Sequence, residues 1–196
     1  MTTDATATPT DDAGDPAAFR ALLDSFVGQP MGAAGPSLAP DPVNVPMIRH
    51  WVDAMDDRNP IYLDDTAAAA TRHGGVVAPP AMLQAWTMPR PIVQGIAERG
   101  GAPQVMSRKS VISILDDHGY TSTRATNSEL EFERYLRPGD VLSSSTLCES
   151  ISDEKTTALG TGFFVTWCTT YVDQHGEVVG RQRFRVLKFR AKGQGE

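Results

Sequence analysis

Long hydrophobic runs are missing from this sequence, and their absence excludes two classes of protein. No apolar run in the 196 residues approaches the roughly 20 residues that a membrane-spanning helix needs, so we expect no membrane contact. The N-terminal stretch MTTDATATPTDDAGDP has neither a basic start nor an apolar segment. This pattern excludes a secretory signal, and we expect a cytoplasmic protein.

Cysteine and histidine are too sparse to form a metal framework. The two cysteines, Cys148 and Cys168, lie in expected strands, and neither belongs to a CxxC pair. The histidines are scattered: His50, His73, His118 and His175. A structural zinc site needs clustered ligands, so we expect no metal and no cofactor. A disulfide would need neighbouring strands, and two reduced, buried thiols are the favoured alternative in a cytosolic protein.

Basic residues are also fewer than acidic residues, with 18 Lys and Arg against 24 Asp and Glu. A net charge of −6 argues against a nucleic-acid-binding protein, although it leaves room for a local basic patch that meets a phosphorylated ligand. With 40% hydrophobic and 21% charged residues, the chain has the composition of one globular domain with a single core. We assign residues 1–17 to a disordered lead-in, residues 18–190 to the domain, and residues 191–196 to a tail or the start of a linker.

The first half of the domain carries helical patterns. Residues 16–29 space apolar side chains at i, i+3, i+4 and i+7, which predicts an amphipathic helix. Helices are also predicted over residues 45–55 and 66–72. Residues 81–88 (AMLQAWTM) are apolar nearly all round, so we expect a buried central helix wrapped by a sheet. Residues 89–119 carry little periodicity, and we assign no element there.

From residue 121 onward the pattern changes to period two. Leu130 and Phe132 alternate with glutamates, which is typical of a half-buried strand. Further strands are predicted over residues 141–152, 161–172 and 178–190. Helices first and antiparallel strands afterwards indicate an α+β domain, not a doubly wound parallel sheet.

Three segments carry recognisable motifs: residues 57–64 (DRNPIYLD), 74–82 (GGVVAPPAM) and 136–140 (LRPGD). The first resembles the hydratase motif of MaoC-like hot-dog enzymes, in which Asp-x-Asn-Pro, an aliphatic residue and His precede a short helix. The second is similar to the segment that enters the hot-dog helix, and the third resembles a family turn between strands. The resemblance covers residues 41–190 and implies an antiparallel β-sheet wrapped around a central helix. It extends to the N-terminal domain of the larger subunit of actinobacterial steroid side-chain enoyl-CoA hydratases.

The chemistry that this resemblance implies depends on a few positions. In active family members the Asp and His of the motif hold a water and add it across a 2-enoyl-CoA double bond. This chain has Asp57 and Tyr62 there, with Asn59 retained, and a phenol with a pKa of about 10 is a poor base near neutral pH. Where a glycine amide supports the enolate oxygen in active members, the chain has Pro79-Pro80, and Pro80 has no N–H. Losing one such donor costs about 3 kcal/mol of transition-state stabilisation, so we expect no working catalytic site in this chain alone.

The resemblance therefore implies a MaoC-like subunit of a heteromeric (R)-specific 2-enoyl-CoA hydratase, a hydro-lyase. This chain would be the degenerate half, which shapes the acyl-CoA pocket for bulky steroid side-chain substrates. A smaller MaoC-like subunit would supply the Asp and His in a heterotetramer. Family members of this kind carry a further C-terminal domain that recruits an aldolase, and the chain ends at residue 196, where a linker to it would begin.

Two other functions fit the same residues. One is a self-sufficient homodimeric hydratase or dehydratase that uses Asp57 and Tyr62. The other is an acyl-CoA-binding assembly module with no part in a hydratase site.

Candidate substrate contacts come from the buried helix and the last strand. Met82 and Trp86 can line a wide acyl tunnel, although core packing is the commoner role for such residues. Three arginines fall on one face of the last strand because side chains alternate, and they can meet the phosphates of coenzyme A. A solvated strand that resists aggregation is the alternative role for them. These arginines are Arg181, Arg183 and Arg185.

Overall fold

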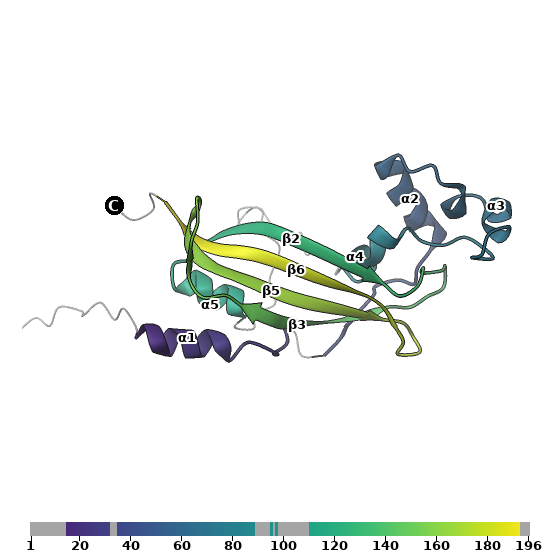
Figure 1. The fold of residues 1–196 in the computed structure, drawn as a ribbon. Helices are drawn as coiled ribbons and strands as arrows, with labels where there is room; N and C mark the ends of the chain where they lie inside the picture. The colour runs from purple at the N-terminus through teal and green to yellow at the C-terminus, as the bar shows by residue number, and fades with distance from the viewer. Residues whose placement is uncertain (1–14, 32–34, 89–94, 96, 98–109, 193–196) are drawn as a thin grey trace, which may run out of the picture.

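The computed structural model describes residues 15–31, 35–88, 95, 97 and 110–192. Within these residues the strands form one antiparallel sheet in the order β1-β3-β5-β6-β2, and the short β4 pairs with β5 (Figure 1). The strands are β1 (Ser37–Leu38), β2 (Ser122–Phe132), β3 (Ser143–Ile151), β4 (Lys155–Thr156), β5 (Gly160–Val172) and β6 (Val178–Ala191).

The strand predicted over residues 161–172 is confirmed as a central strand of the sheet. β5 pairs with β3 on one side and with β6 on the other. Its β-branched and aromatic residues suit a pleated surface that is packed on both faces. Alternation places Phe163, Val165 and Tyr171 on the face that the helices cover, and Phe164 and Cys168 on the outer face.

The helices gather at the two ends of the sheet (Figure 1). α1 and α5 lie at one end, whereas α2, α3 and α4 lie near the other. The helix predicted over residues 45–55 is confirmed at those bounds, and the Asn44 side chain caps it by accepting from the Met47 N–H at 2.9 Å. The helical elements are α1 (Pro16–Asp24), α2 (Val45–Met55), η1 (Pro60–Tyr62), α3 (Asp65–Ala69), η2 (Pro80–Met82), α4 (Leu83–Trp86) and α5 (Val111–Asp117).

The buried core is divided into two clusters at opposite ends of the sheet. The motif-end cluster comprises Val43, Ile48, Val52, Tyr62, Val77, Ala78, Met82, Leu83, Trp86, Leu136, Leu142, Tyr171 and Val179. The α1–α5 cluster comprises Leu23, Val111, Ile114, Leu115, Tyr120, Cys148, Ile151, Phe163, Val165 and Val186. Among the described buried residues, none belongs to both clusters, so each end of the sheet has its own apolar packing.

The central helix predicted over residues 81–88 is shorter than expected. The chain makes the 3₁₀ turn η2 and then only four α-helical residues in α4, and α5 covers the other end of the same face. The apolar pattern did indicate burial correctly, since Met82, Leu83 and Trp86 are at most 3% exposed. An all-round apolar pattern reports burial but not length, because it carries no signal for where a helix stops.

The two edges of the sheet differ in how their backbone groups are satisfied. Beside β3, the Gly28 N–H donates to the Cys148 carbonyl at 2.8 Å and the Met31 N–H to the Thr146 carbonyl at 2.9 Å. The opposite edge strand, β2, pairs only with β6 among the described residues, and nearly all of its 11 residues are exposed. β2 is therefore the open edge of the sheet.

Three smaller expectations can be compared with the structure. Pro16 and Ala17, expected at the end of the lead-in, form the first turn of α1. Residues 1–14 lie outside the described residues, as do residues 193–196 of the expected tail.

Cys148 and Cys168 are both free thiols on opposite faces of the sheet, and burial raises the pKa of Cys148. In the described ranges, no helix is long and apolar enough to cross a membrane.

Candidate functional site

The motif residues 57–62 lie in a lobe formed by α2, η1 and α3 beyond one end of the sheet (Figure 1). α2 ends at Met55, and the C-cap residue Asp56 takes a left-handed conformation with φ of 49°. Asp tolerates this conformation better than most residues, so the chain can turn sharply here. The Asp57 N–H then donates to the Val52 carbonyl at 2.9 Å, which fixes the start of the motif against α2.

The polar side chains of the motif are bonded to their own turn. Asp57 Oδ1 accepts from the Asn59 N–H at 3.0 Å, and Asn59 Oδ1 accepts from the Ile61 N–H at 3.2 Å. Asn59 thereby caps η1, which Pro60 begins. Asp57 is half-buried and Asn59 is exposed. In this arrangement both side chains stabilise the turn that carries Tyr62.

Tyr62 stands where the family motif has its histidine, and its ring is buried in the motif-end cluster at 7% exposure. Burial raises the pKa of Tyr62 above its usual value of 10, and the neighbouring Tyr135 and Asp57 raise it further. The phenol therefore stays protonated near neutral pH and cannot act as a general base. Sequence reasoning missed Tyr135, because a tyrosine just before a turn carries no signal that it lies near the motif.

Backbone donors are scarce where the chain enters α4. Pro79 precedes η2 and Pro80 begins it, and neither has an N–H. Two nearby amides are already used: the Ala78 N–H donates to the Leu136 carbonyl at 2.8 Å, and the Met82 N–H donates to the Pro79 carbonyl at 3.0 Å. The position that supplies an amide to the enolate in active family members therefore offers none here.

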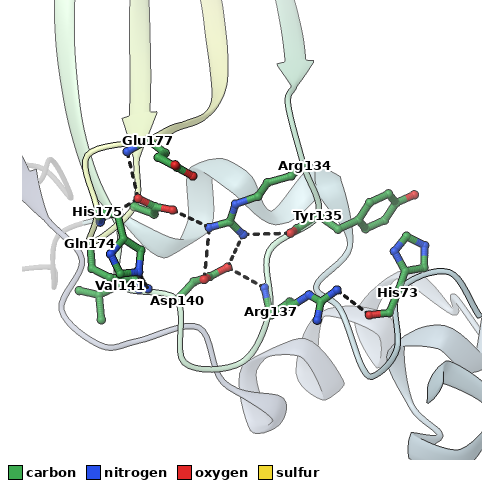
Figure 2. Close-up of polar contacts among 10 residues, drawn as sticks. His73, Arg134, Tyr135, Arg137, Asp140, Val141, Gln174, His175 and Glu177 are labelled. Atoms are coloured by element: carbon green, nitrogen blue, oxygen red, sulfur yellow. Dashed lines mark hydrogen bonds and ion pairs between the residues drawn. The ribbon is translucent and has the colours of Figure 1, made fainter.

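Arg134 fastens the β2–β3 turn to the β5–β6 turn at this end of the sheet (Figure 2). Its Nη1 donates to Asp140 Oδ2 at 2.7 Å and to the Tyr135 carbonyl at 3.1 Å, and its Nη2 donates to Asp173 Oδ2 at 2.8 Å. Asp173 is 6% exposed, and its bond with Arg134 is the main reason that its pKa lies below the usual value. Arg134 thus holds two turns together through charge-assisted hydrogen bonds. Sequence reasoning also missed this arginine, which directly precedes Tyr135.

Arg137, within the predicted LRPGD turn, connects that turn to the motif lobe (Figure 2). Its Nη2 donates to the His73 carbonyl at 2.6 Å, and its N–H donates to Asp140 Oδ2 at 2.8 Å. The His73 ring lies 4.6 Å from the Tyr135 ring between their centroids. The motifs of residues 57–64, 74–82 and 136–140 meet at one end of the sheet, because the Val77 N–H donates to the Ile61 carbonyl at 3.3 Å and the Ala78 N–H donates to the Leu136 carbonyl.

The three arginines of β6 lie together on the outer face of the sheet, as alternation predicted. Two of them are ion-paired within the chain: Arg181 with Glu133 at 2.9 Å, and Arg183 with Glu131 at 2.8 Å and Glu149 at 2.9 Å. Arg185 lies 4.3 Å above the Phe164 ring centroid. These internal partners are what the solvated-strand alternative requires, and contact with coenzyme A stays a prediction.

The structure places Met82 and Trp86 inside the motif-end cluster, at 1% and 3% exposure. Within the described part of the chain, no three His, Cys, Asp or Glu side chains come together in a way that could hold a metal ion. The site therefore consists of the motif turn with its buried Tyr62, the Pro79-Pro80 step and the one-turn helix α4.

Comparison with known proteins identifies the family of this chain. The model of the FAS1-like dehydratase domain region matches residues 31–182. A solved MaoC-like dehydratase has the same fold, with a TM-score of 0.56 at 22% identity over 85% of this chain and 43% of that one. The chain belongs to the MaoC-like hot-dog family of hydratases and dehydratases, which confirms the resemblance drawn from its motifs.

Similar proteins are hydratase alpha subunits. The chain is 51% identical over 175 residues to the probable enoyl-CoA hydratase alpha subunit of Thermomonospora curvata, which is 89% of this chain and 53% of that protein. It is 46% identical over 165 residues to the 3-oxo-4,17-pregnadiene-20-carboxyl-CoA hydratase alpha subunit of Mycobacterium tuberculosis, which is 82% and 50% of the two chains. The chain thus spans about half the length of the curated relatives it matches.

A solved relative is a chain of the ChsH1-ChsH2 complex from Mycobacterium tuberculosis. It superimposes with a TM-score of 0.77 at 37% identity and covers 91% of this chain and 99% of that one. Most of the fold of this chain therefore has a counterpart in a protein whose crystal structure is that of the ChsH1-ChsH2 complex.

Proposed function

We propose that this chain is the degenerate half of a heteromeric (R)-specific 2-enoyl-CoA hydratase. The observation that carries the proposal is the state of the motif: Asp57 and Asn59 cap a turn, Tyr62 is a buried phenol with a raised pKa, and Pro80 has no amide to offer. Water activation and enolate stabilisation would both have to come from another subunit.

The partner is a smaller MaoC-like subunit with an intact Asp and His, and it docks on β2. The β3 edge is occupied by residues 28–31, whereas β2, in the part of the chain that the structure describes, pairs with β6 alone and has no strand on its other side. Antiparallel pairing of two β2-type edges would continue the sheet and bury this open edge. Two such pairs make the heterotetramer, and an aldolase would be recruited by a C-terminal domain outside these residues.

The substrate is a bulky 2-enoyl-CoA of the steroid side-chain type. Support comes from the alpha-subunit relatives, one of which is named for a pregnadiene-carboxyl-CoA, and from the shortened α4, which leaves less helix against the sheet than a full hot-dog helix would. Met82 and Trp86 would border the acyl group, and the three β6 arginines would approach the coenzyme A phosphates.

A reconstitution experiment tests the proposal. The full chain is mixed with a small MaoC-like protein that carries the intact motif, and hydration of a bulky 2-enoyl-CoA is followed by loss of the enoyl-thioester absorbance. We expect negligible activity from this chain alone and full activity from the mixture. Hydrogen exchange on the same samples should slow in β2 on mixing and stay unchanged in β3.

Two outcomes would overturn the proposal in different directions. Turnover by the isolated chain, lost in Asp57→Asn but not in the exposed control Asp53→Asn, would favour a self-sufficient homodimer. Full activity of the partner on bulky substrates without this chain would favour an assembly module.

A further inference from the structure

Trp86, at the end of α4, has a buried donor that nothing in the chain uses. Its side chain is 3% exposed, and Nε1 has no hydrogen-bond partner within the part of the chain that the structure describes. The indole N–H can only donate, so it cannot be satisfied by rotation or by a change of tautomer. Leaving such a group dry and unpaired destabilises a folded protein, and native structures rarely tolerate it without a reason.

The neighbouring Gln182, in contrast, has partners for both polar atoms of its side chain. Gln182 Nε2 donates to Gln84 Oε1 at 3.2 Å and to Ser128 Oγ at 3.1 Å. Gln182 Oε1 accepts from the Tyr171 hydroxyl at 3.2 Å. This network links α4 to β6 through Gln84 and Gln182. Trp86, two residues beyond Gln84, is left with an unused N–H on the same short helix.

We infer that Trp86 Nε1–H donates a hydrogen bond to a carbonyl oxygen of the bound acyl-CoA, and that Trp86 is a substrate-positioning residue. This inference rests on the proposed function. It places the donor on α4, six residues after Pro80, which has no N–H. The oxygen belongs either to the thioester or to a ketone on the acyl body, and both offer the same acceptor chemistry.

Access to the indole requires side chains of the motif-end cluster to move. Met82 packs in the same cluster and is 1% exposed. Methionine is unbranched and polarizable, so it changes rotamer at low cost and can repack against an apolar acyl group. The donor stays shielded from water before and after binding, which strengthens a hydrogen bond formed there.

The experiment uses the three tryptophans of the chain, Trp51, Trp86 and Trp167, as reporters. The full chain is labelled with [¹⁵N-indole]tryptophan, reconstituted with its partner, and titrated with three probes: a polycyclic enoyl-CoA with a ring ketone, the same skeleton without the ketone, and free coenzyme A. Trp51→Phe and Trp167→Phe assign the peaks by elimination, so the assignment does not depend on a Trp86 variant folding.

We expect the Trp86 indole peak to shift and its exchange with solvent to slow on acyl-CoA binding, while the other two peaks move less. A shift with both acyl probes identifies the thioester oxygen, and a shift with the ketone probe alone identifies the ring oxygen. Trp86→Phe should weaken binding of the responding probe roughly fivefold, the size expected for one neutral hydrogen bond.

The possible results distinguish failure of the proposed function from failure of the role assigned to Trp86. If the wild-type complex binds neither acyl probe, the proposed function fails, and this inference fails with it. If the complex binds the probes while the Trp86 peak stays in place, or if Trp86→Phe binds them as tightly as wild type, only the role of Trp86 is overturned.

Discussion

Asp57 occupies the Asp position of the family motif, and its side chain forms a hydrogen bond within its own turn. Its Oδ1 accepts the Asn59 N–H, and the neighbouring phenol of Tyr62 has a raised pKa. In the proposed degenerate half, this carboxylate stabilises the turn and takes no part in proton transfer. The sequence could identify the motif and the substitution at Tyr62, but the capping bonds needed three-dimensional structure.

Asparagine at this position separates the two roles. Asp57→Asn keeps the acceptor for the Asn59 N–H and removes the charge, so activity of the reconstituted complex and stability should both stay within error of wild type. Asp57→Ala removes the cap and should cost about 1 kcal/mol of unfolding free energy without loss of activity. Urea unfolding and the hydration assay measure both, and loss of activity in Asp57→Asn would assign catalysis to this carboxylate.

Asp173 gives the fold a dependence on acid. Its bond with Arg134 lowers its pKa, so the stability it contributes is complete above the unfolded-state value of about 3.9 and is lost as the pH falls through the folded-state value. Asp173→Asn should cost about 2 kcal/mol at pH 7, and the gap from wild type should close below pH 4. Urea unfolding across this range tests the sign, with the exposed Asp153→Asn as control.

Among the elements, prediction from sequence succeeded where a pattern has clear ends. α2 has Asn44 as its cap and an Asp-rich stop, and β5 has a run of β-branched and aromatic residues, so both were located correctly. α5 was missed although Val111, Ile114 and Leu115 have helical spacing and Ser110 forms a capping box with Ser113. Its seven residues are too few for the pattern to stand out from the irregular sequence before it.

α4 depends on one glycine for its seat on the sheet. A Cβ at Gly180 of β6 would lie 2.7 Å from Leu83 Cδ2 and 2.6 Å from the Glu131 carbonyl oxygen. Gly180→Ala must therefore push α4 and β2 away from β6, and we expect a loss of about 1–3 kcal/mol in unfolding free energy. Gly75→Ala, where a Cβ meets nothing within 4 Å, is the matched control. Equal stability of the two variants in urea would show that α4 does not rest on β6 in this way.

For the whole molecule, the two-part core makes a prediction about additivity. Ile48 belongs to the motif-end cluster and Ile114 to the α1–α5 cluster. Ile48→Val and Ile114→Val should each cost about 1 kcal/mol, and the double variant should cost their sum to within about 0.5 kcal/mol. Ile48→Val combined with Val52→Ala, one helical turn away, should deviate from additivity. Coupling across the two clusters in urea unfolding would contradict the division of the core.

The division of the core bears on the proposed degenerate site, because it separates the packing around the motif from the packing of the rest of the fold. Tyr62 and the prolines before α4 draw on the packing of one end of the sheet, whereas α1, α5 and the far halves of the long strands are held by side chains that never touch them. The stability lost through substitutions that abolish catalysis is then lost only at the motif end of the sheet. Two related subunits with such a core can specialise, so that one keeps the catalytic residues and the other changes its half of the pocket for a different substrate. The α1–α5 cluster lets both subunits fold.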